Sequence, residues 1–204
     1  MKITEGLATR FGAQRVVTLD NPLHPEQSLV LLYLELAIPV TILMTNGLSN
    51  YEMPVSEKWK DRAFNELYFC LPTYWDLEDT SNPNFNWVFE WIYRLETFVK
   101  EKQTWFGPGH TIPCGNPPTA ISPIMKQEYF IFLEPMMMER AFTPLQLGDK
   151  TVYFLAITPL FGDELDYKMG KGTHKLVRRF YNRKIDERID DYRANALSSR
   201  MRFF

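Results

Sequence analysis

The segment Thr151–Ile157 constrains the fold more than any other part of this 204-residue chain. It reads Thr-Val-Tyr-Phe-Leu-Ala-Ile, so an extended strand here carries apolar side chains on both faces. Such a strand is typical of the inside of a sheet that is covered on each side. We therefore predict that 151–157 lies inside a central sheet with other layers packed against it.

Other short runs rich in Val, Ile, Leu, Phe and Tyr are bounded by Pro, Gly, Asn or Asp, which is typical of strands. These runs are 29–36, 40–46, 63–71 and 128–134, with a turn at 37–39. The clearest helix follows Asn86, its expected N-cap, because apolar residues then recur with a period of 3.6 as far as Val99. Further helices are predicted after Pro159, from 173 to 181 and from 185 to 196.

The order of these elements indicates the fold class. Strands come mostly in pairs and do not alternate regularly with helices, which favours a mixed sheet with helices packed against it over a doubly wound fold. The chain contains no repeat or long Ser/Gly linker, and its length suits one hydrophobic core. We therefore predict a single α+β domain over 1–204, with a central mixed β-sheet flanked by α-helices.

The charge is distributed unevenly along the chain. Residues 168–204 contain 11 basic and 4 acidic residues and carry +7, whereas residues 1–167 carry −9. The basic residues alternate with acidic ones and lack interleaved aromatic residues, so we read this segment as a solvated helical face and expect no nucleic-acid ligand. The acidic remainder would steer a basic partner and speed its association.

Cysteine content and the apolar runs bear on the compartment. Only Cys70 and Cys114 occur, which excludes a disulfide framework and a CxxC pair and suits a reducing environment. The N-terminal residues lack the pattern of a secretory signal. The apolar run 29–44 contains Glu35 and Pro39 and is shorter than the about 20 residues that a membrane span needs. We expect a cytoplasmic protein that does not enter the membrane and is a monomer when free.

Five segments occur in an order and spacing that resemble the Suppressor of fused family. They are Leu43-Met-Thr-Asn-Gly-Leu-Ser49 with Met53-Pro54, a strand from Glu66-Leu67 to Leu71-Pro72, a tryptophan-led helix from Trp87 to Phe98, the loop Thr104-Trp-Phe-Gly-Pro-Gly-His-Thr-Ile-Pro113, and Pro159-Leu-Phe-Gly-Asp-Glu-Leu-Asp-Tyr-Lys168. The recognisable part covers about 40–195. Each segment is a weak signal by itself, but together they identify a resemblance to the bacterial branch.

This resemblance implies a protein-binding role without catalysis. Animal members grip an extended peptide of a transcription factor, with an acidic residue immediately before the loop His; Gly109 takes that place here, so we do not transfer that ligand. The bacterial branch implies an immunity protein that binds the domain of a cognate polymorphic toxin in the producing cell. The acidic remainder of the chain would suit a basic target such as a nuclease domain.

The loop is the best candidate for the partner site, because Gly and Pro fix its backbone while aromatic residues supply contact area. The candidates there are Trp105, Phe106, Gly107, Gly109, His110, Thr111 and Pro113. The alternative that Trp105 and Phe106 fill the core beneath the loop carries equal weight. Asp163 and Glu164 are further candidates through the resemblance, although carboxylates in the first turn of a helix also stabilise its free N–H groups.

Two other functions stay open. A hydrolase could use His110 with Cys114 or with Glu164, although a structural role for these residues is favoured. A regulator could bind an extended peptide at a sheet edge. No cofactor or metal is expected, because His24, His110 and His174 are scattered and the Gly107-Pro108-Gly109 stretch is not a phosphate loop.

Overall fold

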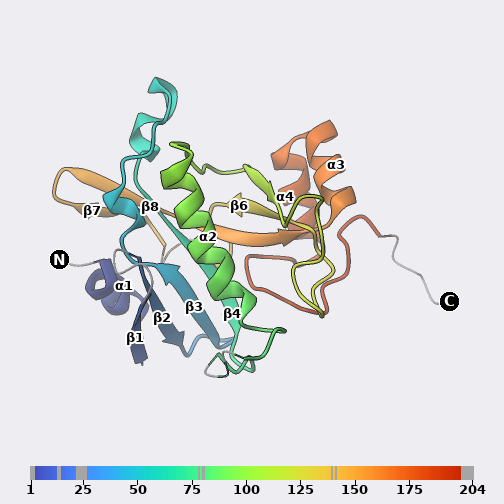
Figure 1. Ribbon diagram of the computed structural model, residues 1–204, viewed down its shortest axis with the longest axis horizontal. Coiled ribbons are helices and arrows are strands. Elements are labelled where there is room, and N and C mark those ends of the chain that lie inside the picture. Colours follow the sequence, from blue (N-terminus) through green and yellow to red (C-terminus); the bar gives the residue numbers. More distant parts are fainter. Residues whose placement is uncertain are drawn as a thin grey trace.

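One mixed β-sheet organises the chain (Figure 1). The computed structural model describes residues 3–12, 15–21, 27–77, 79, 81–138, 140 and 142–198. The strands in hydrogen-bonded order are β1 (Arg15–Asp20), β2 (Ser28–Leu34), β3 (Val40–Thr45), β4 (Asn65–Pro72), β8 (Lys150–Leu160), β6 (Tyr129–Leu133) and β5 (Thr111–Pro113), and β7 (Leu145–Leu147) pairs with the start of β8. Neighbouring strands are antiparallel except β4 and β8, so the predicted mixed sheet is confirmed.

Strand β8 lies inside the sheet, as its sequence predicts. It is paired with β4 on one side and with β6 on the other. Leu155 and Ile157 point into the hydrophobic core on one face of the sheet, whereas Val152 and Phe154 point into the core on the other face. Apolar side chains on both sides of this strand are therefore buried in two separate layers.

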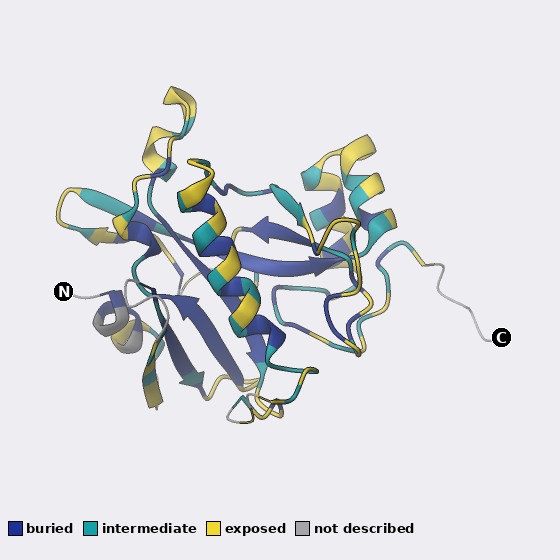
Figure 2. Ribbon diagram, viewed as in Figure 1, coloured by how far each residue is buried: buried dark blue, intermediate teal, exposed yellow. Residues whose placement is uncertain are grey.

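Helix α2 (Trp87–Glu101) covers one face of the sheet (Figure 2). Trp87 and Leu95 are almost fully buried, and the half-buried Trp91 packs edge-on against Phe130 with ring centroids 5.2 Å apart. The predicted helix and its apolar stripe are thus confirmed. Asn86 precedes the helix as expected, but its side chain makes no capping hydrogen bond to the helix.

The opposite face is covered by elements that the sequence did not indicate. Helix α1 (Ile3–Phe11) buries Ile3 and Leu7 against β2 and β3, and the Phe142 ring stacks on Tyr68 at 4.2 Å. Strand β1, at the edge of the sheet, and the short strands β5 and β7 were also not predicted. Two 3-10 helices, η1 (Leu48–Asn50) and η2 (Glu57–Arg62), lie between β3 and β4.

Helices α3 (Gly162–Lys171) and α4 (Thr173–Asn182) form a hairpin at one end of the sheet, where the sequence predicted helices (Figure 1). Leu176 and Phe180 of α4 pack with Ile131 and Leu160 of the sheet in a third apolar cluster. Gly172 joins the two helices with φ of 90°, a conformation that favours glycine. Among the described residues, no helix is long and apolar enough to cross a bilayer.

The predicted helix over 185–196 is wrong. This segment is irregular: Arg188 bridges to Cys70 of β4, and the Ile189 N–H donates to the Cys70 carbonyl at 2.8 Å. Side chains compete for the backbone groups that a helix would use, since the Asp186 carboxylate accepts from the Arg188 N–H and the Asp190 carboxylate from the Tyr192 N–H. Pairing with β4 and these local turns outweigh the helical pattern.

Candidate partner-binding site

The loop that follows α2 begins with a tight helix end. Gln103 adopts a left-handed conformation with φ of 45°. Its N–H donates to the Lys100 carbonyl at 3.3 Å, and the Thr104 N–H donates to the Val99 carbonyl at 3.1 Å. These are the two bonds of a Schellman motif, which ends a helix and turns the chain sharply. The chain therefore leaves α2 in a defined direction, with Trp105 two residues beyond the turn.

Hydrogen bonds to β6 hold the backbone of the 105–110 loop. The Gly109 N–H donates to the Phe132 carbonyl at 2.7 Å, and the Phe132 N–H donates to the His110 carbonyl at 3.0 Å. Within the loop the His110 N–H donates to the Gly107 carbonyl at 3.0 Å. Gly109 has φ of 87°, and a Cβ there would lie closer than 3.0 Å to the Thr173 side chain. The loop is therefore fixed against both the sheet and α4.

Three half-buried aromatic rings meet at this loop. The Trp105 ring contacts the His110 ring edge-on at 4.5 Å between centroids, and the Trp59 ring of η2 at 5.8 Å. Trp105 also lies over Gly107, where a Cβ would be closer than 3.0 Å to its ring. We call Trp59, Trp105 and His110 the aromatic cluster. It combines apolar area with polar ring N–H groups, as protein-binding sites commonly do.

Trp59 was not among the residues predicted from the sequence. It occurs in the charged stretch Glu57-Lys-Trp-Lys-Asp-Arg62, where a tryptophan has no helical or strand stripe to join. An isolated tryptophan among charged residues is the signal that could have identified it. Only the fold shows that it meets Trp105, 46 positions later in the chain.

The sequence left open whether Trp105 and Phe106 contact a partner or fill the core, and the structure gives a different answer for each residue. Phe106 is buried and stacks on Phe132 at 4.1 Å, so it fills the core beneath the loop. Its ring also lies parallel to that of Phe98 of α2, at 6.1 Å. Phe106 thus supports the loop from below, whereas Trp105 keeps part of its surface open to a partner.

His110 is the titratable member of the aromatic cluster. Burial lowers the pKa of its imidazole, a hydrogen bond at the Trp105 backbone acts in the opposite direction, and the nearby Lys168 lowers it further. A neutral ring is therefore favoured. A neutral imidazole has one N–H donor and one acceptor nitrogen, and the hydrogen bond at the Trp105 backbone already uses the donor, so the other ring nitrogen is left to accept a hydrogen bond from a partner.

Thr111 and Pro113 follow the loop in β5, the edge strand next to β6. Thr111 is half-buried and Pro113 is exposed. Pro113 has no N–H, so it reduces the hydrogen bonds that an added strand could form at this edge. Side-chain contacts at the aromatic cluster are therefore better supported here than strand addition at β5.

Glu164 does not lie on this surface, and its predicted role as a contact residue is wrong for this structure. Its carboxylate is fully buried and accepts two hydrogen bonds from Arg193, at 2.7 and 2.9 Å. It also accepts from the N–H groups of Ala196 and Phe161. Its role is to anchor the C-terminal segment to the start of α3. Asp163 accepts a hydrogen bond from Asn195 but is exposed, so a partner could still reach it.

The geometry does not assemble the suggested hydrolase. Cys114 is buried, and burial followed by the charge of Glu128 raises the pKa of its thiol, which favours the unreactive protonated form. In the described part of the chain no hydrogen bond joins His110 to Cys114 or to Glu164. No group of three or more His, Cys, Asp or Glu side chains there could hold a metal ion. His24 lies outside the described residues.

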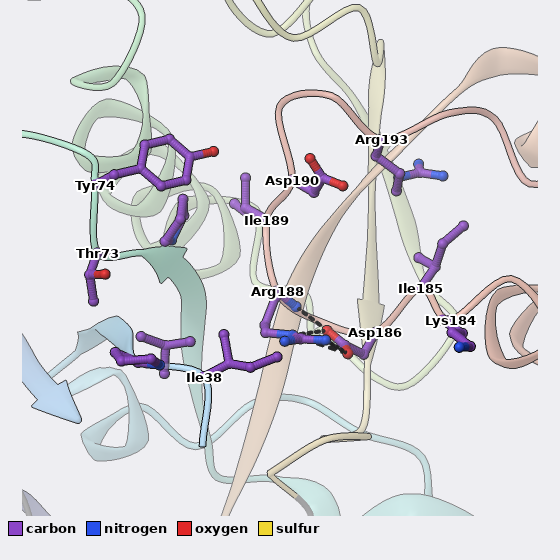
Figure 3. A pocket seen from close by; sticks show the side chains of 13 residues that line it. Ile38, Thr73, Tyr74, Lys184, Ile185, Asp186, Arg188, Ile189, Asp190 and Arg193 are labelled. Atoms are coloured by element: carbon purple, nitrogen blue, oxygen red, sulfur yellow. Dashed lines mark hydrogen bonds and ion pairs between the residues drawn. The ribbon is translucent and has the colours of Figure 1, made fainter. Parts of the chain in front are cut away.

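A separate pocket of about 410 Å³ lies between the β2–β3 turn, the end of β4 and the C-terminal segment (Figure 3). Its two arginines are already paired, Arg188 with Asp186 and Arg193 with the buried Glu164, and Lys184 and Asp190 also line it. The Tyr74 hydroxyl donates to Asp191, and desolvation first and then this bond raise its pKa to about 12. These arginines and Tyr74 are held by their own partners, and the aromatic cluster remains the stronger candidate.

These features define an α+β domain with a mixed sheet, a rigid aromatic loop at its surface and no assembled catalytic group in the described residues. The model of the Suppressor of fused protein family matches residues 28–193. The chain therefore belongs to the Suppressor of fused family.

Comparison with solved structures supports the fold. A Suppressor of fused homologue from Neisseria gonorrhoeae has a TM-score of 0.69 and 12% identity, over 96% of this chain and 94% of that one. The structure of the Sufu–Fu complex has a TM-score of 0.69 and 14% identity, over 95% of this chain and 90% of that one. Drosophila Suppressor of Fused has a TM-score of 0.68 and 15% identity, over 96% of this chain but 50% of that one. Comparison with curated protein sequences gives no match.

Proposed function

We propose that this protein works by binding another protein, without catalysis, and that the aromatic cluster is the centre of the contact. The observation that carries this proposal is the preorganised geometry of Trp105, held between Trp59, His110 and Gly107 on a backbone bonded to β6. A rigid aromatic surface loses little conformational entropy on binding. Aromatic residues that are partly open and well supported are frequent energetic centres of protein interfaces.

The partner that best suits this site is the toxin domain of a polymorphic toxin, with this chain as the immunity protein that neutralises it in the cytoplasm. Three observations support this: membership of the Suppressor of fused family, the resemblance to its bacterial branch, and the net −9 of residues 1–167. An acidic body would attract a basic toxin domain such as a nuclease and increase the association rate.

The direct test is co-expression with the C-terminal domain of any large secreted protein that a neighbouring gene encodes. Wild type should restore growth, and Trp105→Ala should weaken binding by about 2 kcal/mol or more and reduce rescue. Tyr181→Ala is the matched control, because Tyr181 is an exposed aromatic residue on α4, outside the cluster. Equal loss in both variants, or no binding by wild type to any neighbouring gene product, would contradict the proposal.

Gly107→Ala tests whether binding depends on the position of the Trp105 ring or only on its presence. The new methyl group would displace the Trp105 ring while every aromatic residue is kept. Because the group that must shift is the far end of a half-buried side chain and not the backbone, the fold should tolerate the change. Binding should weaken mainly through faster dissociation, measured by surface plasmon resonance with thermal melting as the folding control. Unchanged dissociation would show that the position of Trp105 does not matter.

A further inference from the structure

Strand β1 leaves one side of its backbone open. The Asn21 N–H donates to the Gln27 carbonyl at 3.2 Å, so in the antiparallel register with β2 the odd-numbered residues face β2. The N–H and C=O groups of Val16, Thr18 and Asp20 therefore point away from the sheet. In the described residues no other strand pairs with this side of β1.

The middle of this edge strand also lacks the features that usually protect an edge. Natural edge strands are commonly short, or carry Pro, inward charges or Lys. The opposite edge, β5, follows that rule with three residues that include Pro113. By contrast, β1 has six residues without Pro or Lys, its charged residues Arg15 and Asp20 stand only at its two ends, and both Val16 and Thr18 between them are exposed. Its backbone is therefore accessible to another strand.

An apolar groove of about 360 Å³ lies beside β1, on the face that carries α2. Val17 and Leu19 of β1 line it together with Leu31 and Tyr33 of β2, and Phe89 and Tyr93 of α2 border it. Side chains of an added strand would continue this apolar surface, because cross-strand neighbours on one face pack together. The open backbone and the groove are independent observations that lie at the same edge.

We infer that β1 pairs with β1 of a second copy of this chain, antiparallel, with the twofold axis passing between the two Thr18 residues. In this register Val16 lies opposite Asp20 of the second copy and Thr18 opposite Thr18. All the outward N–H and C=O groups of these three residues are then paired in both copies. The result is one sheet continuous across the two chains, with an isologous interface.

Side chains in this register favour a second copy as the occupant. On the groove face Val17 lies opposite Leu19 of the second copy, so apolar residues meet. Arg15 lies opposite Asn21, and no like charges are opposed. A single ladder buries less than the roughly 1,200–2,000 Å² of a stable interface, so the dimer should dissociate on dilution. This inference replaces our expectation of a monomer and does not depend on the proposed function.

The first test is the molar mass of the free protein by analytical ultracentrifugation. The mass should rise from 24.1 kDa in the low micromolar range towards twice that value as the concentration approaches millimolar. A mass that stays at 24.1 kDa throughout would overturn the inference.

Thr18→Pro tests the backbone ladder. Its N–H points away from β2, so proline removes an intermolecular bond and no bond within the sheet. The variant should fold and remain monomeric at every concentration. Thr111→Pro is the matched control, since Thr111 lies on the opposite edge strand β5, and it should dimerise as wild type does. Self-association of Thr18→Pro equal to that of wild type would overturn the inference.

A charge swap tests the register, and it needs no proline. Thr18→Lys and Thr18→Glu should each be monomeric, because each would place like charges opposite one another across the axis. Mixed in equal amounts, the two variants should form a heterodimer, detected by tagging one of them. A mixture that stays as monomeric as its components would overturn the register and the inference with it.

Discussion

Glu66 is a fully buried carboxyl at the start of β4. It accepts hydrogen bonds from the Thr45 hydroxyl and from the N–H groups of Gly47 and Ser49, both at 3.1 Å. It therefore holds the turn that follows β3, where Gly47 has φ of 141°. Burial outweighs these hydrogen bonds and raises the pKa of Glu66 to about 7 from the ordinary 4.5.

This carboxyl predicts an unusual dependence of stability on pH. Between about pH 4.5 and 7 the folded chain retains a proton that the unfolded chain releases, so the free energy of unfolding decreases as pH rises, by roughly 3 kcal/mol in total. Glu66→Gln should remove this slope while keeping the turn, because the amide oxygen can accept the two N–H bonds. Urea unfolding across this range measures it. Glu52→Gln, at an exposed site, should keep the wild-type slope; a Glu66→Gln slope equal to wild type would refute the assignment.

The two tryptophans at the start of α2 should differ in their contribution to stability. Trp87 is 3% exposed and packs edge-on against Phe69 at 5.4 Å, so Trp87→Ala should cost about 3–5 kcal/mol of unfolding free energy. Trp91 is only half-buried, so Trp91→Ala should lower the free energy of unfolding clearly less. Chemical denaturation of both variants tests the difference. Equal costs would mean that burial of these rings does not decide their contribution.

At the scale of elements, one ion pair ties the C-terminal segment to α3. The Glu164 side chain is fully buried, the Arg193 side chain is 7% exposed, and Arg193 also donates to the Pro159 carbonyl at 3.0 Å. Glu187 acts similarly further back along the segment, because it accepts from three consecutive N–H groups at Met136, Met137 and Met138. Buried carboxylates thus fix a segment that has no regular secondary structure.

Removing one partner of this ion pair should be costly. Glu164→Ala leaves Arg193 buried without its counter-charge, and the free energy of unfolding should fall by about 3–5 kcal/mol. Asp163→Ala is the matched control, since it removes an exposed carboxylate from the adjacent position and should cost less than about 1 kcal/mol. Thermal and urea unfolding give the comparison. A small loss for Glu164→Ala would show that the segment does not depend on this pair.

Over the whole molecule, α3 and the basic helix α4 lie together at one end of the sheet (Figure 1), and Lys168 of α3 is near His110. On the other side of the aromatic cluster, η2 carries the exposed Asp61 two residues beyond Trp59. If the partner is a basic toxin domain, Asp61→Lys should slow association several-fold at low salt and leave dissociation nearly unchanged. The deficit should shrink as salt rises. Lys175→Glu, on α4, should not slow association. Stopped-flow mixing at two salt concentrations separates these results, and an Asp61→Lys rate equal to wild type would exclude steering by this charge.

Local patterns in the sequence determined much of the fold. The run 151–157, with apolar residues on both faces, forms part of β8, and the apolar residues spaced 3.6 apart from Trp87 to Val99 lie on α2. The helix predicted after Pro159 is α3, and the helix predicted over 173–181 is α4. These elements could be predicted because each buries its own repeated apolar residues, so the pattern and the structure have the same period. The presence of a loop at 105–110 could also be predicted, since Pro fixes φ and lacks an N–H while Gly admits backbone conformations that helices and strands rarely use.

The tertiary structure alone decided the rest. Trp59 joins Trp105 only because η2 lies beside the end of α2, and Glu164 is buried only because Arg193 returns to it from the C-terminal segment. The segment 185–196 has helical apolar spacing, yet Ile189 pairs with β4 instead. Each outcome depends on contacts between residues far apart in the chain, whose free energies exceed the small local preferences that a sequence pattern reveals.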